Sequence, residues 1–277
     1  MRVLILILIV VVLLPSGLLY NVLSPLNARR RWPYGVDDVY KYVKNDMLHM
    51  FDMIDIDVRK KTVETVAGYR CMKHTYNKFQ IWEIYDILNE AECNKIINLS
   101  KHAGFVEAQV LLDDDTVGNN DYVRKGGVSW VGKGRDPVID KLSRIASSIT
   151  KLPIENQEIL QVSKYTVGQM FTSHYDPCIP ENHSDNFCDH ENFYAGARIM
   201  TFLLYLNDDF TGGETDFPAI PFTVRPKRGK AILFWNTDEN EILHDEALHR
   251  GKEVISGEKY IGTIWFHIRA IPRQFIP

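Results

Sequence analysis

The order of hydrophobic and polar positions changes near Pro153, and it predicts helices before this point and strands after it. Downstream, short apolar runs alternate with clusters of turn-forming residues such as NDDFTGGET and ISGEK. Short runs rich in β-branched and aromatic residues between turn clusters predict β-strands. The clearest of these runs are EILQVSKY, RIMTFLLYL, KAILFW and KYIGTIWFHIR.

Two helices are predicted upstream, and each has its own start signal. In LNEAECNKIINLSKHAGF, Asn89 and Glu92 fit a capping box, and Gly104 fits a helix stop. The second helix begins with Asp136 as its cap and Pro137 at the first helical position. The apolar residues of the two helices recur at helical spacing: Cys93, Ile96 and Ile97 in the first, and Val138, Leu142, Ile145 and Ile149 in the second.

Helices followed by many short strands predict an α+β fold. This order favours helices packed on one sheet of a β-sandwich or jelly roll. Of the two, we expect a double-stranded β-helix, or jelly roll, with the N-terminal helices packed on one of its sheets. Strands and helices do not alternate along the chain, and this argues against a doubly wound dinucleotide-binding fold.

The N-terminus differs from the rest of the chain. MRVLILILIVVVLLPSGLLY contains an unbroken apolar run from Val3 to Leu14, and apolar residues resume after Gly17. The run suits the hydrophobic region of a signal peptide, and the extended stretch is just long enough to span a bilayer. No small-x-small cleavage motif follows, so residues 1–25 are expected to form an uncleaved signal anchor. Residues 26–76 are expected to form a stalk or helical lead-in, and residues 77–277 the folded domain.

Two observations disagree about the side of the membrane on which the domain lies. Arg29–Arg31 follow the apolar run, and the positive-inside rule taken alone places this cluster and the domain in the cytosol. Two glycosylation sequons, which begin at Asn98 and Asn182, point instead to a luminal domain.

Charge and cysteine content exclude two classes of site. The chain has 32 Lys and Arg against 36 Asp and Glu, a formal net charge of −4. Nucleic-acid-binding domains carry a basic excess, so no nucleic-acid partner is predicted. The four cysteines form no C-x-x-C pair, which argues against a zinc ribbon. Cys178 and Cys188 bracket one loop and could pair in an oxidising compartment.

A His-x-Asp pair in FTSHYDPC is the clearest candidate for chemistry. Residues two apart in a strand point to the same face, so His174 and Asp176 can offer an imidazole and a carboxylate to one cation. His244 and His249 compete for the place of a third ligand. Two histidines and one carboxylate form the facial triad of non-haem Fe(II) oxygenases, which leaves coordination positions open for substrate and O₂.

A lysine further along the chain fits the same chemistry. Many such oxygenases take electrons from 2-oxoglutarate, whose distal carboxylate needs a cation in the same cavity. Lys259 lies ten residues after His249, beyond the Gly257 turn and at the start of a predicted strand. Its position is therefore suitable for binding that carboxylate.

Residues 77 to 268 resemble the catalytic domain of prolyl 4-hydroxylases, within the Fe(II)/2-oxoglutarate dioxygenases. The matching stretches are LPIENQEILQVSKYTVGQMFTSHYD, ARIMTFLLYLNDDFTGGETDFP, VRPKRGKAILFW and LHRGKEVISGEKYIGTIWFH. They contain, in the family's order, H-x-D, R-x-x-T-x-L-x-Y-L-N, G-G-E-T-x-F-P, and a second histidine followed ten residues later by lysine.

The resemblance implies a set of site residues and an activity. It implies His174, Asp176 and His249 as iron ligands, Lys259 on the distal carboxylate of 2-oxoglutarate, and Tyr165 beside this co-substrate. His244 lacks a lysine ten residues downstream and is not favoured. The implied cofactors are Fe²⁺, 2-oxoglutarate, O₂ and ascorbate. The implied reaction is hydroxylation of peptidyl proline to 4-hydroxyproline, as in procollagen-proline 4-hydroxylases, with release of succinate and CO₂.

Two stretches depart from the family pattern. Tyr260 stands where the family has tryptophan, and VRKGGVSWV replaces the family's R-T-S segment. The latter region resembles the mobile loop that closes over the peptide. The peptide-binding and subunit-pairing regions of the long collagen enzymes are absent, so the chain looks like the short membrane-anchored forms. These face the lumen, and we expect a single-pass endoplasmic reticulum membrane protein with a luminal catalytic domain. The sequence predicts no particular oligomeric state.

Two other functions remain open at this point. The enzyme could hydroxylate another residue or a small molecule, or the domain could be a catalytically dead binding module on a membrane anchor. Loss of a ligand would indicate the dead module, and here the three ligands and the lysine are all present. Arg198 is interpreted as part of a structural ion pair, and His267 as a strand residue that packs near the site.

Overall fold

The computed structural model describes residues 59–77, 79–108, 110–111, 117–118, 124–178, 195–238 and 240–272. These residues all belong to one compact unit, Leu48–Pro277. The predicted anchor, most of the predicted stalk and the sequon at Asn182 lie outside the described residues. In the part of the chain that is described, no helix combines the length and apolar character needed to cross a membrane.

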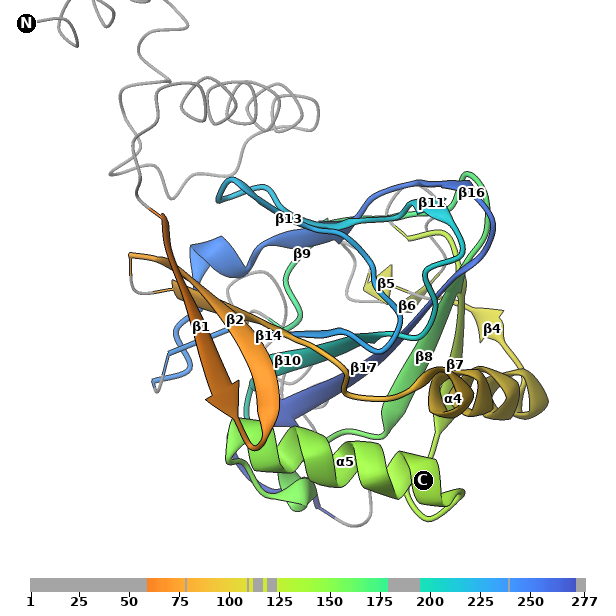
Figure 1. The fold of residues 1–277 in the computed structure, drawn as a ribbon, viewed down its shortest axis with the longest axis horizontal. Coiled ribbons are helices and arrows are strands. Elements are labelled where there is room, and N and C mark those ends of the chain that lie inside the picture. The colour runs from red at the N-terminus through yellow and green to blue at the C-terminus, as the bar shows by residue number, and fades with distance from the viewer. Residues whose placement is uncertain are drawn as a thin grey trace, which may run out of the picture. The chain divides into compact units, whose positions relative to one another are not determined.

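Two antiparallel sheets face each other in the described residues (Figure 1). The larger sheet has nine strands, in the spatial order β1 (Arg59–Val66), β2 (Tyr69–Tyr76), β3 (Phe79–Ile84), β14 (Ala231–Trp235), β10 (Arg198–Tyr205), β17 (Lys259–His267), β8 (Leu160–Tyr165), β7 (Gly127–Val131) and β4 (Val106–Glu107). The smaller sheet has four, in the order β13 (Phe222–Val224), β12 (Thr215–Phe217), β15 (His249–Gly251) and β9 (Phe171–His174). Shorter pairs join β11 (Thr211–Gly212) to β16 (Val254–Ser256) and β5 (Val110–Leu111) to β6 (Val117–Gly118). From β8 onward the chain passes repeatedly from one sheet to the other, which is the jelly-roll arrangement that the sequence predicts.

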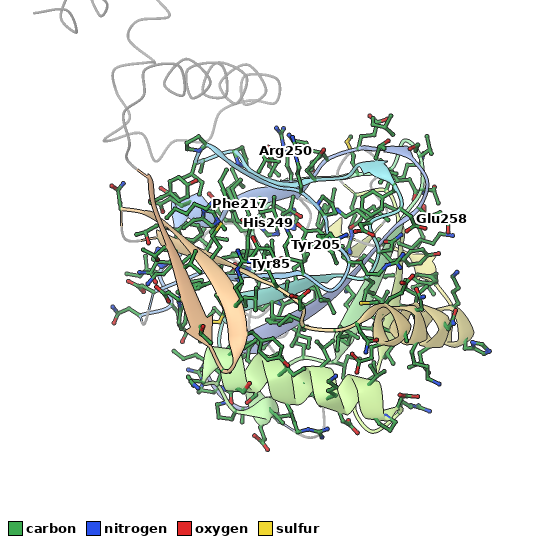
Figure 2. The ribbon with its side chains drawn as sticks, viewed as in Figure 1. Tyr85, Tyr205, Phe217, His249, Arg250 and Glu258 are labelled. Atoms are coloured by element: carbon green, nitrogen blue, oxygen red, sulfur yellow. The ribbon has the colours of Figure 1, made fainter. Side chains whose placement is uncertain are left out.

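Strand β10 shows why the run RIMTFLLYL has no alternating polar positions. Successive residues of a strand point to opposite faces of the sheet. Phe202 and Leu204 belong to the core cluster that the large sheet shares with the helices, whereas Leu203 and Tyr205 belong to the cluster between the two sheets. Figure 2 shows Tyr205 and Phe217 in this second cluster. Because both faces are buried, apolar side chains occupy every position from Phe202 to Tyr205.

The two predicted helices are confirmed. In α4 (Glu90–Ala103), the Asn89 side chain accepts a hydrogen bond from the Glu92 N–H at 2.9 Å, and the Glu92 carboxylate accepts one from the Asn89 N–H at 3.0 Å. In α5 (Pro137–Thr150), the cap Asp136 accepts a hydrogen bond from the Val138 N–H at 3.0 Å. The buried apolar side chains of both helices belong to one core cluster with those of the large sheet, and Figure 1 shows the helices on the side of this sheet away from β9 and β13.

The folded domain begins before the predicted boundary at residue 77. Strands β1 and β2 form a hairpin, and β2 pairs with β3 along its whole length. Cys71 and His74 on β2 are fully buried. The interpretation of residues 26–76 as a stalk or helical lead-in is therefore wrong for residues 59–76. Among the described residues, the outer strand β1, RKKTVETV, pairs with β2 alone, and residues 61–66 are exposed or half-buried. Its sequence is therefore polar and lacks the apolar run of a buried strand.

Candidate active site

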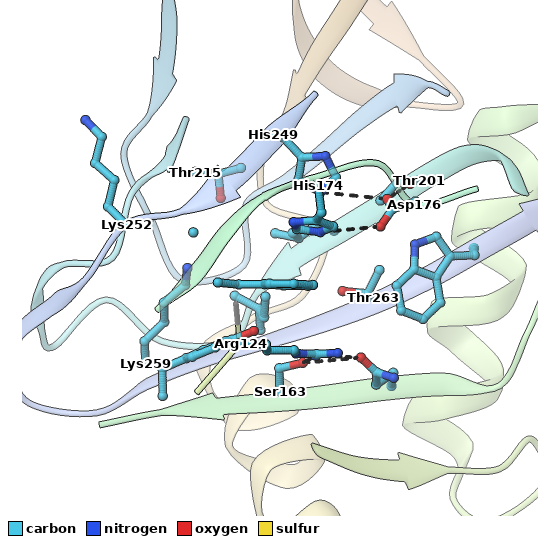
Figure 3. A pocket seen from close by; sticks show the side chains of 17 residues that line it. Arg124, Ser163, His174, Asp176, Thr201, Thr215, His249, Lys252, Lys259 and Thr263 are labelled. Atoms are coloured by element: carbon cyan, nitrogen blue, oxygen red, sulfur yellow. Dashed lines mark hydrogen bonds and ion pairs between the residues drawn. The ribbon is translucent and has the colours of Figure 1, made fainter. Parts of the chain in front are cut away.

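Three side chains with metal-binding atoms lie together at one end of the small sheet. His174 ends β9, His249 begins β15, and the two residues are directly paired across these strands. Nε2 of His174 lies 3.7 Å from Oδ1 of Asp176, and Nε2 of His249 lies 3.8 Å from Oδ2 of Asp176. One ligand atom from each residue lies within 4.8 Å of the other two, so a single ion can contact all three (Figure 3).

Hydrogen bonds on the far side of each imidazole set its tautomer. Nδ1 of His174 donates to the Thr172 carbonyl at 2.8 Å, and Nδ1 of His249 donates to the Ala247 carbonyl at 3.0 Å. A carbonyl only accepts, so the proton lies on Nδ1 and the lone pair of Nε2 faces Asp176. Burial, together with the neighbouring His249, lowers the pKa of His174 to about 3. Its imidazole is therefore neutral at physiological pH, as a metal ligand must be.

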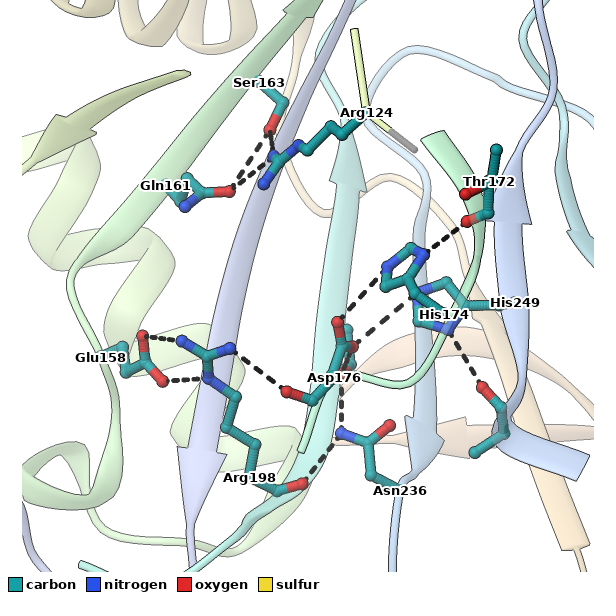
Figure 4. Close-up of polar contacts among 12 residues, drawn as sticks. Arg124, Glu158, Gln161, Ser163, Thr172, His174, Asp176, Arg198, Asn236 and His249 are labelled. Carbon is teal, nitrogen blue, oxygen red and sulfur yellow. Dashed lines mark hydrogen bonds and ion pairs between the residues drawn. The ribbon is translucent and has the colours of Figure 1, made fainter. Parts of the chain in front are cut away.

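Asp176 is held by two hydrogen bonds that leave its charge in place. Thr201 on β10 donates to Oδ2. Arg198 donates to the backbone carbonyl of Asp176 at 3.2 Å (Figure 4). Asn236 in turn donates to the Thr201 oxygen at 2.8 Å. Burial alone raises the pKa of Asp176, but the two imidazoles and the Thr201 hydroxyl outweigh it and lower the pKa below the usual value. The side chain is therefore a carboxylate.

A buried ionic network supports this region from the large sheet. Glu158 accepts a bidentate contact from Arg198, with one branch at 3.1 Å, and it accepts from Nε2 of His267 at 2.9 Å. The Arg198 guanidinium also lies 4.2 Å from the centre of the Trp265 ring. The structural ion pair predicted for Arg198 is confirmed, and the position of His267 on a strand near the site is confirmed with it.

Lys259 lies in the same pocket as the three ligand residues. It begins β17, and its direct partner on β8 is Tyr165, whose ring centre lies 5.5 Å from Nζ. The lysine is 2% exposed, and no carboxylate of the described residues forms an ion pair with it. Burial lowers its pKa to about 8, and the more distant charge of Glu214 offsets this only in part. A buried ammonium without a counter-ion is costly, so this pocket is suited to an anionic ligand.

The G-G-E-T motif forms the turn that the sequence predicts and brings Thr215 into this pocket. Gly212 and Gly213 have φ values of +74° and +64°, and a Cβ at Gly212 would lie 2.3 Å from the Glu253 carbonyl. Only glycine fits this left-handed, closely packed turn. The turn leads into β12, whose first residue, Thr215, lines the pocket opposite Lys259.

Two residues of the pocket wall were not assigned from the sequence. Arg124 donates from Nη2 to the side chains of Gln161 and Ser163, both at 3.1 Å, and its guanidinium lies 4.6 Å from the centre of the Phe171 ring. Phe171 stacks on the His174 imidazole with ring centres 3.5 Å apart. Arg124 is the arginine that aligns with the family's R-T-S segment, and this match was the available signal for it. Phe171 had no such signal.

His244 does not belong to the ligand cluster. It precedes the short helix η3 (Asp245–Ala247), and its ring centre lies 5.8 Å from that of Phe79. Among the cysteines, Cys178 is in a disulfide, and Cys71 and Cys93 are free and buried. Cys188, the predicted partner of Cys178, lies outside the described residues.

Comparison with known proteins gives the family. Residues 160–267 match the 2OG-Fe(II) oxygenase superfamily. The chain is 33% identical to prolyl 4-hydroxylase 5 of Arabidopsis thaliana over 204 residues, 66% of this chain and 67% of the relative. It is 32% identical to prolyl 4-hydroxylase 2 of the same plant over 219 residues, 71% of this chain and 70% of the relative. The viral collagen prolyl hydroxylase of Paramecium Bursaria Chlorella virus-1, solved as a 2OG complex, superposes with a TM-score of 0.53 at 28% identity and covers 67% of this chain and 94% of that chain.

The jelly roll, the ligand cluster and these matches define a 2OG-Fe(II) oxygenase. Within this superfamily, the chain belongs to the prolyl 4-hydroxylase family, and it is an oxidoreductase. Membership implies Fe²⁺, 2-oxoglutarate and O₂. The residues present fit this requirement, because two imidazole nitrogens and one carboxylate oxygen are the donor set that suits Fe(II), and an unpaired buried lysine faces the same pocket.

Proposed function

We propose that the protein is a dioxygenase that hydroxylates peptidyl proline, using Fe(II) held by His174, Asp176 and His249, and 2-oxoglutarate bound at Lys259. For each proline converted to 4-hydroxyproline, one 2-oxoglutarate and one O₂ are consumed, and succinate and CO₂ are released. One observation carries the proposal: the ligand cluster and the unpaired ammonium of Lys259 open into one pocket.

His174, Asp176 and His249 would supply three donors to the ion, and this would leave positions for exchangeable ligands. Bound Fe(II) supplies O₂ activation, for which 2-oxoglutarate provides two electrons. The Nδ1–H bonds of His174 and His249 keep their Nε2 lone pairs directed at the site. Thr201 keeps Asp176 ionised and fixed. These contacts pre-organise the donor set, so little reorganisation is needed when the ion binds.

The pocket walls bind and orient the co-substrate. Lys259 Nζ provides the charge for the distal carboxylate, and the Tyr165 ring lies directly beside it. Phe171 and Ile261 contribute apolar surface to the wall of this pocket. A low-dielectric wall strengthens the lysine–carboxylate contact and excludes water from the reacting atoms.

Peptidyl proline is proposed as the substrate because the similar proteins are named prolyl 4-hydroxylases, and the similar solved structure is named a collagen prolyl hydroxylase. We propose ascorbate as the reductant that returns the iron to Fe(II). We also propose a single-pass anchor in residues 1–25 with the catalytic domain in the endoplasmic reticulum lumen. Protection of the domain from protease in sealed microsomes tests this location, and digestion without detergent would contradict it.

The activity is tested by mass spectrometry of proline-containing peptides incubated with the protein, Fe(II), 2-oxoglutarate, ascorbate and isotopically labelled O₂. We expect one labelled oxygen atom on proline, matched by succinate production. The control is the Asp176→Ala variant, which should form neither product. Succinate production by the wild type with no oxygen incorporated into any proline peptide would contradict the substrate assignment and leave the oxygenase class intact.

A further inference from the structure

A row of side chains on the large sheet begins inside the pocket and continues beyond it. Thr263 on β17 is paired with Gln161 on β8, and Gln161 is paired with Trp130 on β7. Residues directly paired in an antiparallel sheet point to the same face. Thr263 and Gln161 line the pocket, so Trp130 extends the pocket-facing surface by one more strand.

Trp130 is exposed to an extent that its neighbours are not. Its exposed fraction is 47%, against 7% for Gln161 and 5% for Thr263. No other aromatic side chain within the described ranges reaches the exposed class. The adjacent residue on β7, Val131, is buried against the helices, so the strand is well anchored below the indole. A large ring on a rigid strand beside a pocket is a preformed contact surface for a ligand that extends out of that pocket.

The surface between the pocket and Trp130 is polar. Arg124 donates to Gln161, which belongs to the row, and to Ser163, which lies two residues further along β8 (Figure 4). Donors of this kind suit the backbone carbonyls of a peptide, while an exposed indole suits an apolar side chain. This order of polar then aromatic surface matches an extended peptide that leaves the pocket across β8 and β7.

We propose that Trp130 is an outer subsite for the peptide substrate and that its indole packs against the side chain three residues from the reacting proline. The preferred residue at that position is a second proline. The inference rests on the proposed proline hydroxylase function and adds a sequence preference to it.

Spacing determines the number three. Neighbouring strands lie about 4.8 Å apart, so Trp130 lies about 10 Å from Thr263 across the sheet. A polyproline II helix rises about 3.1 Å per residue with about three residues per turn. We place the reacting proline over Thr263, which lines the pocket beside Asp176 (Figure 3). The residue three positions from it then lies about 9 Å away and on the same face. Proline-rich peptides in this conformation bind aromatic surfaces with little loss of conformational entropy.

The test uses glycine- and serine-based peptides that contain one reacting proline and a second proline moved from two to five positions away on either side. For the wild type, we expect KM to be lowest when the second proline is three positions away, roughly tenfold below the peptide without it. In Trp130→Ala, KM should no longer depend on the position of the second proline, and kcat should stay at the wild-type value. Trp130→Phe keeps a ring and should keep part of it.

The matched control is Val63→Ala, because Val63 is a 65% exposed side chain on the opposite edge strand of the same sheet. It should show the wild-type position preference. Thermal unfolding and 2-oxoglutarate binding show whether Trp130→Ala is folded. If Trp130→Ala does not fold, the position preference of Trp130→Phe is compared with that of the wild type instead. An unchanged position preference in the Trp130 variants would overturn the subsite while hydroxylation continues. A wild type that hydroxylates none of the peptides would overturn the proposed function, and the subsite with it.

Discussion

Thr201 donates its hydroxyl hydrogen to Oδ2 of Asp176, although its strand, β10, contributes none of the three ligand residues. The direction of this bond is fixed because an ionised carboxylate only accepts, and the Thr201 oxygen itself accepts from the Asn236 amide at 2.8 Å. One carboxylate oxygen is therefore bound by the protein, and Oδ1 remains available beside Nε2 of His174. The large sheet thus orients a ligand that is carried by the chain after β9.

Replacing Thr201 by Val should weaken metal binding, because the isosteric methyl group cannot donate to Asp176. Loss of such an outer hydrogen bond typically reduces metal affinity by about 10- to 100-fold. Titration with Fe(II) under anaerobic conditions measures the change. Thr201→Ser retains the hydroxyl and should retain most of the affinity. Equal metal affinities for the Val and Ser variants would show that the bond to Oδ2 does not orient the ligand.

Substitution of His249 and of His244 should have opposite effects on metal binding. His249→Ala removes one of three donors and should abolish both stoichiometric Fe(II) binding and turnover. His244→Ala lies outside the cluster and should retain both, since its ring packs beside Phe79 instead. Metal titration and peptide turnover are measured for each variant. Loss of metal binding in His244→Ala with retention in His249→Ala would reverse the assignment.

Lys259→Ala should weaken 2-oxoglutarate binding without weakening metal binding. Truncating one partner of a buried charge pair costs about 2–5 kcal/mol, which corresponds to roughly 30-fold or more in affinity. Lys259→Arg should recover part of the loss, because a planar fork replaces a compact ammonium. Titration of 2-oxoglutarate with saturating metal gives both values. Wild-type affinity in Lys259→Ala would remove this lysine from the binding site.

The affinity for 2-oxoglutarate should depend on pH through Lys259. Its pKa in the free protein is about 8, and the bound dianion favours the charged form and raises that pKa. Affinity should therefore be constant below about pH 8 and fall by about tenfold per pH unit above it, as the free protein loses the proton that binding requires. The Lys259→Arg variant stays charged and should show no fall in this range. The same fall in 2-oxoglutarate affinity above about pH 8 in the wild type and in Lys259→Arg would show that Lys259 does not cause the pH dependence.

A second buried ionic cluster, far from the ligands in sequence, should control acid stability. Glu83 accepts from His74 and from Lys230, each at 2.8 Å. Burial alone raises the pKa of Glu83, but these two contacts outweigh it and lower the pKa from 4.5 to about 2. A folded-state pKa below the unfolded one stabilises the protein fully above about pH 4.5, and this stabilisation is lost as the pH falls towards 2.

We expect Glu83→Gln to lower the free energy of unfolding at pH 7 by about 3 kcal/mol, with the difference from wild type shrinking between pH 4.5 and pH 2. Urea unfolding at several pH values measures it. Glu253→Gln changes an exposed glutamate and should alter stability by less than about 0.5 kcal/mol. If the loss of unfolding free energy in Glu83→Gln is the same at every pH, the loss comes from packing and not from the charge of Glu83.

The elements that the sequence predicted are those whose signals are local. The capping box at Asn89 and the Asp136-Pro137 start specify their helices within one turn. The spacing of His174 and Asp176 reports a shared strand face without knowledge of the fold. Lys259 was found because a fixed interval in the chain, across the Gly257 turn, separates it from His249.

The remaining parts depend on register between strands that are distant in sequence. Thr201 on β10 meets Asp176 after β9, and Arg124 before β7 meets Gln161 on β8, through contacts between segments that are distant in sequence. No periodicity within one segment reports such a contact. The hairpin of β1 and β2 was missed for a different reason, since a partly exposed outer strand carries charged residues that resemble a solvated stalk.

The direct pairing of His174 with His249 restricts how this protein lineage can change in length. Between these residues and the next pair, Phe171 and Gly251, the two strands are already out of step by one residue. One further insertion or deletion here would turn an imidazole to the opposite face of the sheet and end catalysis in a single mutational event. Viable indels near the metal ligands should therefore accumulate after Asp176, where a longer or shorter chain leaves this pairing intact.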